Sequence, residues 1–286
     1  MTLYKPSELH RFLNELGVKP KKKLSQNFLI DGNILKKMVE VTDLQQQDTV
    51  IEVGPGPGVL TEALLAKGAS AIAIEKDEKL ARHLQRLQNG KLQILTDDFR
   101  NICFKRLVKK KGKVKVIANI PYSLTGIILQ ELLPKQNLVL SIHLMVQKEV
   151  AERCTADVKT KGYSSFTLFT AYHADAKLLF TVPKTCFYPK PKVDSAVLEL
   201  KLKPPPVDAP YKKLFAMIRM AFQMRRKMVR TSLTKIASRQ SIETALETLG
   251  LAKNVRPQEL TLADFSALFH ILDSNKTEET ESQCNA

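Results

Sequence analysis

The residues with the clearest chemical potential are Asn119, Ile120, Pro121 and Tyr122, which end the hydrophobic run Val114–Ala118. The side-chain oxygen of Asn119 can accept a hydrogen bond from an amino group. Because a residue before proline prefers extended geometry, the carbonyl of Ile120 can be held outward as a second acceptor. Tyr122 adds a flat ring on which a planar base can stack. This combination suits the exocyclic amine of an adenine, whereas for the four residues alone a strand that stops at a proline turn is the simpler interpretation.

A glycine-rich loop, Glu52–Gly58, follows an earlier predicted strand and precedes a helical pattern. Gly54 and Gly56 let a ligand approach the backbone, and the start of the helix offers N–H groups. The third glycine comes one residue too early for the dinucleotide-binding fingerprint, and no Gly-Lys-Ser/Thr follows as a P-loop requires. A nicotinamide enzyme and a P-loop protein are therefore disfavoured. The spacing resembles the E-x-G-x-G-x-G loop of S-adenosylmethionine-dependent methyltransferases, and a turn without a ligand remains the alternative.

Two further predicted strands end in carboxylates. Glu75 comes 21 residues after Gly54 and can accept both hydroxyls of a ribose, or it is a solvated charge. Asp98 can accept the amino group of an adenine while Phe99 packs on the ring, or it caps a turn. Because the carboxyl ends of parallel strands meet at one edge of a sheet, four consecutive strand ends would present groups suited to one nucleoside.

The pattern of apolar runs predicts an α/β fold. Strand-like runs alternate with helical spacing, which indicates a Rossmann-like, mostly parallel sheet with helices on both faces. Residues 176–182 and 193–202 lack an intervening helix and predict an antiparallel hairpin at the end of the sheet. The other strands are predicted at 49–53, 71–75, 92–95, 114–119 and 141–146, and helices at 60–67, 78–87 and 124–133.

Pro204–Pro206 is the best candidate for a linker. It divides the chain into a predicted catalytic domain, residues 1–203, and a small all-helical domain, residues 207–273. Helices are expected in the second domain at 212–230, 241–250 and 261–272. The polar tail, 274–286, is expected to be disordered.

The formal charge of +16 points to a polyanionic partner, although a basic protein can also bind a membrane surface. Lysine and arginine outnumber acids by six to two in residues 1–24, seven to none in 105–115 and nine to one in 207–240. Three separate clusters suit an extended RNA or DNA backbone. On the predicted helix 212–230, the cations that we assign to RNA binding, rather than to a solvated face, are Arg219, Arg225, Arg226, Lys227 and Arg230.

Four cysteines, Cys103, Cys154, Cys186 and Cys284, lie far apart in the sequence. Their spacing predicts neither a metal site nor a disulfide framework, and it favours a reducing compartment. Residues 1–24 do not resemble a signal peptide, and no apolar run approaches the roughly 20 residues that span a bilayer. We expect a cytoplasmic protein without a membrane segment or a metal.

An ordered set of motifs is similar to those of the rRNA adenine N6-dimethyltransferases, and within them to the bacterial small-subunit branch whose loss confers kasugamycin resistance. The resemblance covers roughly residues 19–273. Each segment is weak alone, but the ordered set is specific. The segments are Ser25–Leu29, Glu52–Gly58, Ile74-Glu75, Asp98, Asn119–Tyr122, Leu144–Val150, Phe187–Ala196 and Phe222–Lys227.

The resemblance implies S-adenosyl-L-methionine as cofactor. Residues at the carboxyl ends of the predicted strands would bind it, and Gln26–Leu29 would fold over its methionine end. It implies that Asn119, Ile120, Pro121 and Tyr122 hold the target adenine, with Phe187 closing on the other face. The implied partner is small-subunit rRNA in an immature ribosomal subunit, with two adjacent adenosines near the 3′ end of 16S rRNA dimethylated by a monomer. The implied cofactor residues are Gln26, Asn27, Leu29, Gly54, Gly56, Glu75, Asp98, Phe99 and Asn119.

Three departures from the family pattern are Ser25, Ser123 and Met224, where glycine, asparagine and glutamine are usual. None removes a proposed ligand. The alternatives are a large-subunit rRNA methyltransferase conferring macrolide resistance, a DNA adenine methyltransferase, and a mainly non-catalytic ribosome assembly factor. The run Phe187–Ala196 favours the small-subunit branch over the first, and Asn119 in place of aspartate argues against the second.

Overall fold

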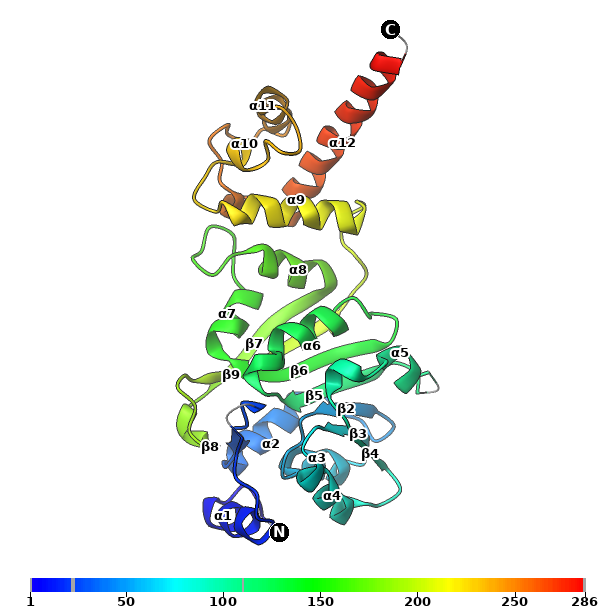
Figure 1. Ribbon diagram of the computed structural model, residues 1–286, viewed down its shortest axis with the longest axis vertical. Helices are drawn as coiled ribbons and strands as arrows, with labels where there is room; N and C mark the ends of the chain where they lie inside the picture. The colour runs from blue at the N-terminus through cyan, green and yellow to red at the C-terminus, as the bar shows by residue number, and fades with distance from the viewer. Residues whose placement is uncertain (1, 22–23, 110, 285–286) are drawn as a thin grey trace. The chain divides into compact units, whose positions relative to one another are not determined.

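The structure is a computed structural model that describes residues 2–21, 24–109 and 111–284, with side chains described as far as residue 274. It divides into two compact units. Unit 1 comprises Met1–Ala151 and Ala174–Lys203, and unit 2 comprises Glu152–His173 and Pro204–Ala286. The ribbon in Figure 1 labels the helices and strands of both units.

Within the described residues of unit 1, seven strands form a mixed sheet in the order β4–β3–β2–β5–β6–β9–β7. The pairs from β4 to β6 are parallel, and β9 pairs antiparallel with both β6 and β7. The predicted fold class and edge hairpin are confirmed. The strands are β2 (Thr49–Val53), β3 (Ser70–Glu75), β4 (Leu92–Thr96), β5 (Val114–Asn119), β6 (Val139–Gln147), β7 (Ala174–Val182) and β9 (Ser195–Leu202).

The central strands are apolar on both faces, as a sheet covered by helices requires. In β2, β5 and β6, side chains such as Ile51, Val116 and Leu144 are fully buried. The helices of unit 1 alternate with the strands, and α7 contains the boundary between the units. They are α1 (Pro6–Glu15), α2 (Gly32–Glu40), α3 (Val59–Ala66), α4 (Glu78–Leu84), α5 (Phe104–Leu107), α6 (Thr125–Leu132) and α7 (Lys148–Cys154).

The strand order reverses between β2 and β5. From β2 the chain proceeds outward to β3 and β4, then returns to β5 on the other side of β2. In open α/β sheets a ligand binds at such a switch point, outside the carboxyl ends of the strands. The register aligns these ends, with Val53 opposite Ile74 and Glu75 opposite Thr96. A small second sheet pairs β1 (Phe28–Leu29) with β8 (Phe187–Tyr188), which fixes the segment before α2.

Unit 2 is helical and has its own core, and it takes in residues 152–173, which we had expected in the catalytic domain. The reason is packing: Tyr163, Leu168 and Tyr172 are buried in one cluster with apolar side chains from the C-terminal helices. The sequence analysis missed α8 altogether. The helices are α8 (Ser165–His173), α9 (Tyr211–Gln223), α10 (Val229–Ser232), α11 (Arg239–Thr248) and α12 (Leu262–Cys284).

Two expectations for the C-terminal part need correction. The predicted helix 212–230 is broken after Gln223, because the N–H of Lys227 bonds to the carbonyl of Met224 and the N–H of Val229 bonds to that of Val255. The helix α12 continues into the expected disordered tail as far as Cys284, and no glycine or proline interrupts that stretch. Residues 285 and 286 lie outside the described residues.

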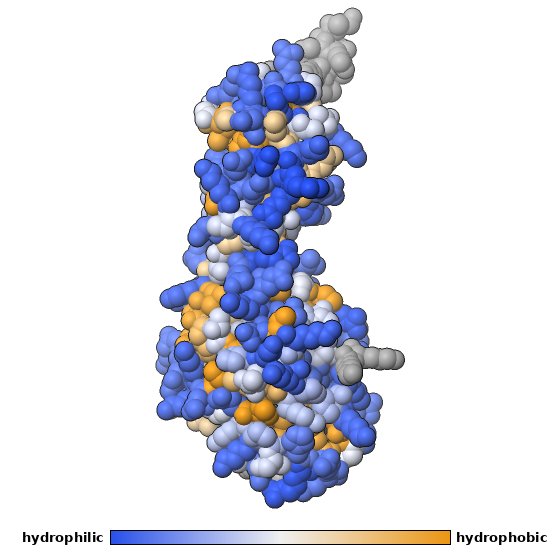
Figure 2. Space-filling view, turned by 90° about the vertical axis from the view of Figure 1, so that its left-hand side faces the viewer, coloured by the Kyte–Doolittle hydropathy of each residue, from blue (hydrophilic) through white to orange (hydrophobic). Residues whose placement is uncertain are grey.

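Figure 2 shows hydrophilic residues over most of the face in view, with hydrophobic residues in small scattered groups. No helix in the described part of the chain is both long enough and apolar enough to pass through a membrane.

Candidate active site

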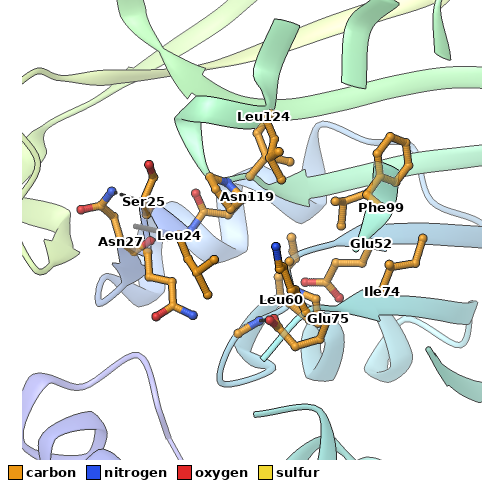
Figure 3. A pocket seen from close by; sticks show the side chains of 18 of the residues that line it. Leu24, Ser25, Asn27, Glu52, Leu60, Ile74, Glu75, Phe99, Asn119 and Leu124 are labelled. Carbon is orange, nitrogen blue, oxygen red and sulfur yellow. Dashed lines mark hydrogen bonds between the residues drawn. The ribbon is translucent and has the colours of Figure 1, made fainter. Parts of the chain in front are cut away.

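A cavity of about 250 Å³ opens at the switch point of the sheet (Figure 3). In Figure 3 the side chains of Asn27 and Asn119 lie on one side of it, and those of Glu52 and Glu75 on another. The structure brings together the whole predicted cofactor set, because all nine residues line this cavity: Gln26, Asn27, Leu29, Gly54, Gly56, Glu75, Asp98, Phe99 and Asn119.

Asn119 is the last residue of β5, and its side-chain amide is oriented by the chain itself. Its Nδ2 donates to the backbone carbonyl of Asn27 at 3.2 Å, so Oδ1 is left as an acceptor at the cavity. Ile120 and Pro121 also line the cavity. The side chain of Ile120 is buried at 3% exposure, which holds the backbone of this residue in place.

Tyr122 and Phe187, predicted to hold the target adenine, are not among the residues that line the cavity. The hydroxyl of Tyr122 makes a 2.6 Å hydrogen bond with that of Ser195, and burial raises its pKa. The ring of Phe187 is in the core of unit 1, on β8 opposite Leu29 of β1. Strand pairing and burial hold Phe187, and the bond to Ser195 holds the hydroxyl of Tyr122. A stacking role for either ring stays a prediction.

The glycine loop offers space rather than hydrogen-bond donors. Gly54 and Gly56 have φ of +69° and +56°, a region that favours glycine. Their N–H groups are already used, by the carbonyl of Ile74 at 2.9 Å and by the carboxylate of Glu75 at 2.9 Å. The N–H of Gly58 likewise bonds to the carbonyl of Pro55. The backbone N–H groups of these three glycines are therefore not free to donate to a ligand, as they would need to be for a bound phosphate.

Glu75 is a buried carboxylate held at the end of β3. Its Oε2 accepts from the N–H of Gly56, and its Oε1 accepts from the N–H of Asp77 at 2.8 Å. Burial raises its pKa, and the two N–H groups oppose that rise. Each oxygen keeps a second lone pair, so Glu75 can still accept hydroxyl hydrogens from a ribose.

Glu52 lines the cavity, and the sequence analysis did not assign it a role. It is 1% exposed, and its Oε2 accepts from the hydroxyl of Thr61 at 2.6 Å. Burial raises the pKa of Glu52 to about 8, the Thr61 hydroxyl lowers it, and the nearby charge of Glu75 adds to the rise. A carboxyl in an otherwise apolar strand immediately before the glycine loop was the signal that could have identified it.

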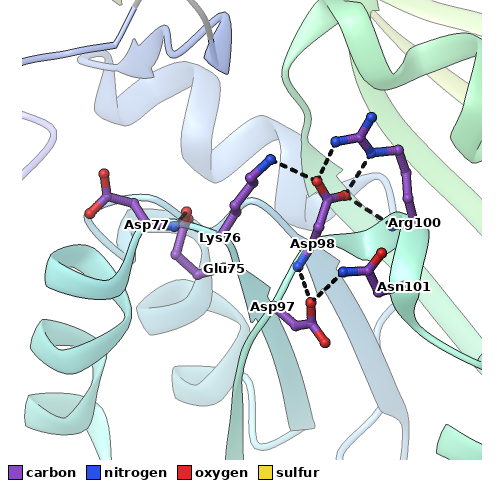
Figure 4. Close-up of polar contacts among 7 residues, drawn as sticks. All are labelled: Glu75, Lys76, Asp77, Asp97, Asp98, Arg100 and Asn101. Atoms are coloured by element: carbon purple, nitrogen blue, oxygen red, sulfur yellow. Dashed lines mark hydrogen bonds and ion pairs between the residues drawn. The ribbon is translucent and has the colours of Figure 1, made fainter.

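Asp98 is more constrained than the sequence suggested (Figure 4). Arg100 donates from Nε to Oδ1 at 3.0 Å and from a terminal nitrogen to Oδ2 at 2.6 Å, and Lys76 donates to Oδ2 at 2.9 Å. These cations, Arg100 foremost, hold the pKa of the carboxyl well below its usual range. An adenine amine would have to share Asp98 with Arg100 and Lys76, both of which also line the cavity.

The segment before β1 forms another wall. Ser25, where the family usually has glycine, has φ of +51°. Its carbonyl accepts from the Asn27 side chain at 3.1 Å, and the side chain of Gln26 accepts from the N–H of Lys21. The left-handed conformation explains why glycine suits this position. Residues 22 and 23 lie outside the described residues.

The cations predicted to bind RNA divide into two groups. Arg219, Arg226 and Lys227 are exposed, and no ion pair reaches them among the described residues. Arg225 donates to the carbonyl of Thr160 at 3.1 Å. Arg230 is three-quarters buried and pairs with Glu243 at 2.7 Å. Arg225 and Arg230 therefore also make contacts within unit 2, and their binding to RNA stays a prediction, as it does for Arg219, Arg226 and Lys227.

The charged side chains that line the cavity indicate which class of ligand it can bind. Its lining includes the carboxylates of Glu75, Asp97 and Asp98, and its cations, Lys76 and Arg100, are both bound to Asp98. Such a lining repels phosphate and suits an uncharged or cationic nucleoside. Among the described residues, no group of three or more His, Cys, Asp or Glu side chains could hold a metal ion.

Comparisons with known proteins show the family of the chain. The family model for ribosomal RNA adenine dimethylase matches residues 17–274. The ribosomal RNA small subunit methyltransferase A of Protochlamydia amoebophila is 46% identical, over 96% of this chain and 99% of its own. That of Chlamydia caviae is 38% identical, over 96% of this chain and 100% of its own.

Two solved structures show the same fold. A dimethyladenosine transferase from Plasmodium falciparum superposes with a TM-score of 0.73, at 24% identity, over 87% of this chain and 98% of its own. The 23S rRNA methyltransferase ErmE superposes with a TM-score of 0.69, also at 24% identity, over 86% of this chain and all of its own. On the family match and the identity to these curated relatives, the chain belongs to the ribosomal RNA adenine dimethylase family.

Proposed function

We propose that the protein transfers methyl groups from S-adenosylmethionine to the N6 amines of two adjacent adenosines near the 3′ end of 16S rRNA, during assembly of the small ribosomal subunit in the cytoplasm. The observation that carries the proposal is the acceptor pair at the end of β5, where Asn119 has Oδ1 free at the cavity and Ile120 follows it. Relatives at 46% and 38% identity are named as small-subunit methyltransferases, which supports the small-subunit substrate over the large-subunit one.

The residues of the cavity fit the proposed cofactor. Glu75 would accept the ribose hydroxyls, Asp98 would share the adenine amine, and Phe99 and Ile74 would contact the adenine ring. Residues 26–29 would cover the methionine end. When bound, the cofactor supplies an electrophilic methyl group on a sulfonium. The carboxylates of the lining favour that positive charge, and the absence of free glycine N–H groups suits a ligand without phosphates.

The chain's task in the reaction is to make the adenine amine a better nucleophile. The lone pair of N6 is delocalised into the ring, so the amine is weak until it becomes pyramidal. Asn119 Oδ1 and the Ile120 carbonyl would each accept one N6 hydrogen and fix the nitrogen in that geometry. No strong base is needed beforehand, because the methylated nitrogen is acidic and releases its proton readily. After the first transfer one N–H remains, and a single acceptor can hold it.

The target base must leave its stack to reach this cavity, which costs a few kcal/mol unless the RNA presents it in a loop. Tyr122, fixed through its hydroxyl to Ser195, would then meet the base at the rim. Phe187 is buried at 2% exposure, so its ring would have to become accessible before it could close on the other face of the base. We therefore assign base capture to Asn119 and Ile120, and the stacking contribution to Tyr122 before Phe187.

The direct test uses the purified protein and small ribosomal subunits from cells that lack this gene. Methyl-labelled cofactor should yield N6,N6-dimethyladenosine at two adjacent positions of the small-subunit rRNA, and none in large subunits treated in parallel. Label in large-subunit rRNA would instead support the macrolide-resistance alternative, and the absence of label from both subunits would refute an rRNA methyltransferase.

A further inference from the structure

Seven basic residues fall between positions 105 and 115, and the structure separates them by role. Lys115 is buried and pairs with Asp48 at 2.8 Å, so it is structural. Lys110 lies outside the described residues. The other five are exposed, and no ion pair or side-chain hydrogen bond reaches them in the part of the chain that the structure describes. We name these five the α5 basic patch: Lys105, Arg106, Lys109, Lys111 and Lys113.

The α5 basic patch is built on an anchored segment. Phe104 and Val108 are 2% and 1% exposed, so α5 and the turn after it are fastened to the core of unit 1. The turn continues through Gly112 at φ of +69° into β5. No aspartate or glutamate occurs between residues 99 and 130. Five cations that lie close in the sequence, with no ion pair among the described residues, repel one another, and a bound polyanion would relieve that repulsion.

The patch lies along the connection between two walls of the cavity. The segment leaves the carboxyl end of β4, where Asp98 and Arg100 line the cavity, and leads to the start of β5, whose far end is Asn119. A strand of six residues spans roughly 20 Å. About six phosphates of one nucleic-acid strand cover that distance. An RNA strand that delivers a base to Asn119 is therefore long enough to run over the patch.

The chemistry of the patch favours a phosphodiester backbone over a protein surface. Protein interfaces are enriched in aromatic side chains and depleted in lysine. The patch has four lysines and one arginine, and the exposed large apolar side chains of the described chain all lie outside residues 99–113. Lysine contacts phosphate as a point charge and reads no sequence.

We propose that the α5 basic patch is a second RNA-binding surface, on the methyltransferase unit itself, that holds the phosphodiester backbone of the substrate strand. This proposal rests on the proposed rRNA substrate. The α9–α10 turn, residues 224–228, carries the exposed cations Arg226 and Lys227 in unit 2. The patch would add an electrostatic contact with RNA on unit 1, which carries the cavity.

The test compares two triple variants that remove the same charge. One neutralises the patch, Lys105→Gln with Lys109→Gln and Lys113→Gln. The control is Lys36→Gln with Lys67→Gln and Lys177→Gln, exposed lysines of unit 1 that lie outside the three basic clusters; of these, Lys36 has an ion pair among the described residues, at 3.8 Å to Glu40. Binding to transcribed small-subunit rRNA and to isolated small subunits is measured over a series of salt concentrations. Cofactor titration verifies that both variants are folded.

The patch variant should bind RNA on the order of tenfold or more weakly at 150 mM salt, and the slope of log affinity against log salt should fall by roughly 2, at about 0.7 per lost contact with a single strand. The control should change by less than half as much. Equal effects of the two triples would overturn the proposal. So would a loss confined to intact subunits with an unchanged salt slope, because that result indicates an acidic protein partner. If the wild type methylates normally and the patch variant binds RNA as tightly as the wild type, the RNA-binding role of the patch is refuted and the proposed function is not. If the wild type has no methyltransferase activity, the proposed function is refuted.

Discussion

The side chain of Asn119 donates from Nδ2 to the backbone carbonyl of Asn27 at 3.2 Å. This bond joins the end of β5 to the segment that would cover the cofactor. It also uses a hydrogen of Nδ2, while Oδ1 accepts no hydrogen bond among the described residues and Asn119 lines the cavity. If Asn119 holds the base and Asn27 lies against the cofactor, as we propose, displacing either residue should disturb both ligands.

The clamp on Asp98 predicts a pH dependence of cofactor binding. Because Arg100 is the main cause of the lowered pKa of Asp98, Arg100→Gln should raise that pKa towards its ordinary value. The carboxylate is then lost at a higher pH as the solution is acidified. We expect cofactor affinity of the variant to fall between pH 6 and pH 3.5 by a larger factor than that of the wild type, because the ordinary pKa of an aspartate, 3.8, lies within that window. Titration calorimetry at the two pH values measures it.

Arg82→Gln provides the control, because Arg82 is exposed and, in the part of the chain that the structure describes, pairs only with Glu78 on its own helix. It should leave the pH dependence of cofactor binding unchanged. The same pH response in wild type, Arg100→Gln and Arg82→Gln would show that Asp98 does not bind the cofactor.

The sequence predicts those features of the site that depend on neighbouring residues in the chain, and it misses those that depend on contacts between distant segments. The alignment of Glu75, Asp98 and Asn119 at one sheet edge follows from strands that can be recognised one at a time. The clamp by Lys76 and Arg100 depends on side-chain directions, and the use of the Gly56 N–H by Glu75 depends on a turn 19 residues away. Neither has a signature in residue spacing.

The same reason explains the errors in the second unit. Residues 152–173 precede two strands of the sheet, so chain order placed them in the catalytic domain, and only the packing of Tyr163 and Tyr172 into the helical core reveals where they belong. The helix break after Gln223 arises from the long-range bond between Val229 and Val255, which apolar periodicity does not report.

The raised pKa of Glu52 predicts that the free energy of unfolding falls as the pH rises. Its pKa of about 8 in the folded protein lies above the ordinary value of 4.5, so between these values the folded state binds more protons than the unfolded state. The free energy of unfolding should therefore be highest near pH 4.5 on account of this group and should decline towards pH 8. Glu52→Gln should remove on the order of 1–2 kcal/mol of the difference between pH 6 and pH 8.

Urea denaturation of the cofactor-free protein at pH 6 and pH 8 measures this effect. Glu131→Gln, which changes an exposed carboxylate, is the matched control. An unfolding free energy whose pH dependence is the same in both variants and in the wild type would contradict a protonated Glu52.

Gly56 tests whether the loop needs both its backbone conformation and its space. A Cβ there would lie 3.0 Å from the Phe28 ring, at φ of +56°. Gly56→Ala should destabilise the protein by about 1–3 kcal/mol and weaken cofactor binding, because the shift also moves the N–H that holds Glu75. Gly90→Ala is the control, since Gly90 has φ of +79° but open space around its Cβ position. If Gly90→Ala lowers the free energy of unfolding and the cofactor affinity as much as Gly56→Ala does, the close approach of the Phe28 ring to Gly56 has no role.

The α9–α10 turn should bind RNA through its unpaired cations. Arg226→Gln with Lys227→Gln should weaken RNA binding and lower its salt dependence by roughly 1.4, while leaving the unfolding transition unchanged. Arg230→Gln should instead lower stability, because it leaves the half-buried Glu243 with one partner fewer. Filter binding over a salt series and urea denaturation distinguish the two effects. A larger RNA defect in Arg230→Gln than in the double variant would reverse this assignment.

The central claim is that Asn119 holds the target adenine, and it is tested most directly in cells that lack this gene. These cells receive the wild type, Asn119→Ala, or the control Asn137→Ala, whose exposed side chain makes no hydrogen bond among the described residues. Losing one preorganised hydrogen bond to the reacting group should slow transfer by about 10²–10³. Mass spectrometry of the small-subunit rRNA then measures N6,N6-dimethyladenosine. We predict normal levels with the wild type and Asn137→Ala and a severe loss with Asn119→Ala at equal protein abundance, whereas wild-type levels of dimethyladenosine with Asn119→Ala would contradict the account.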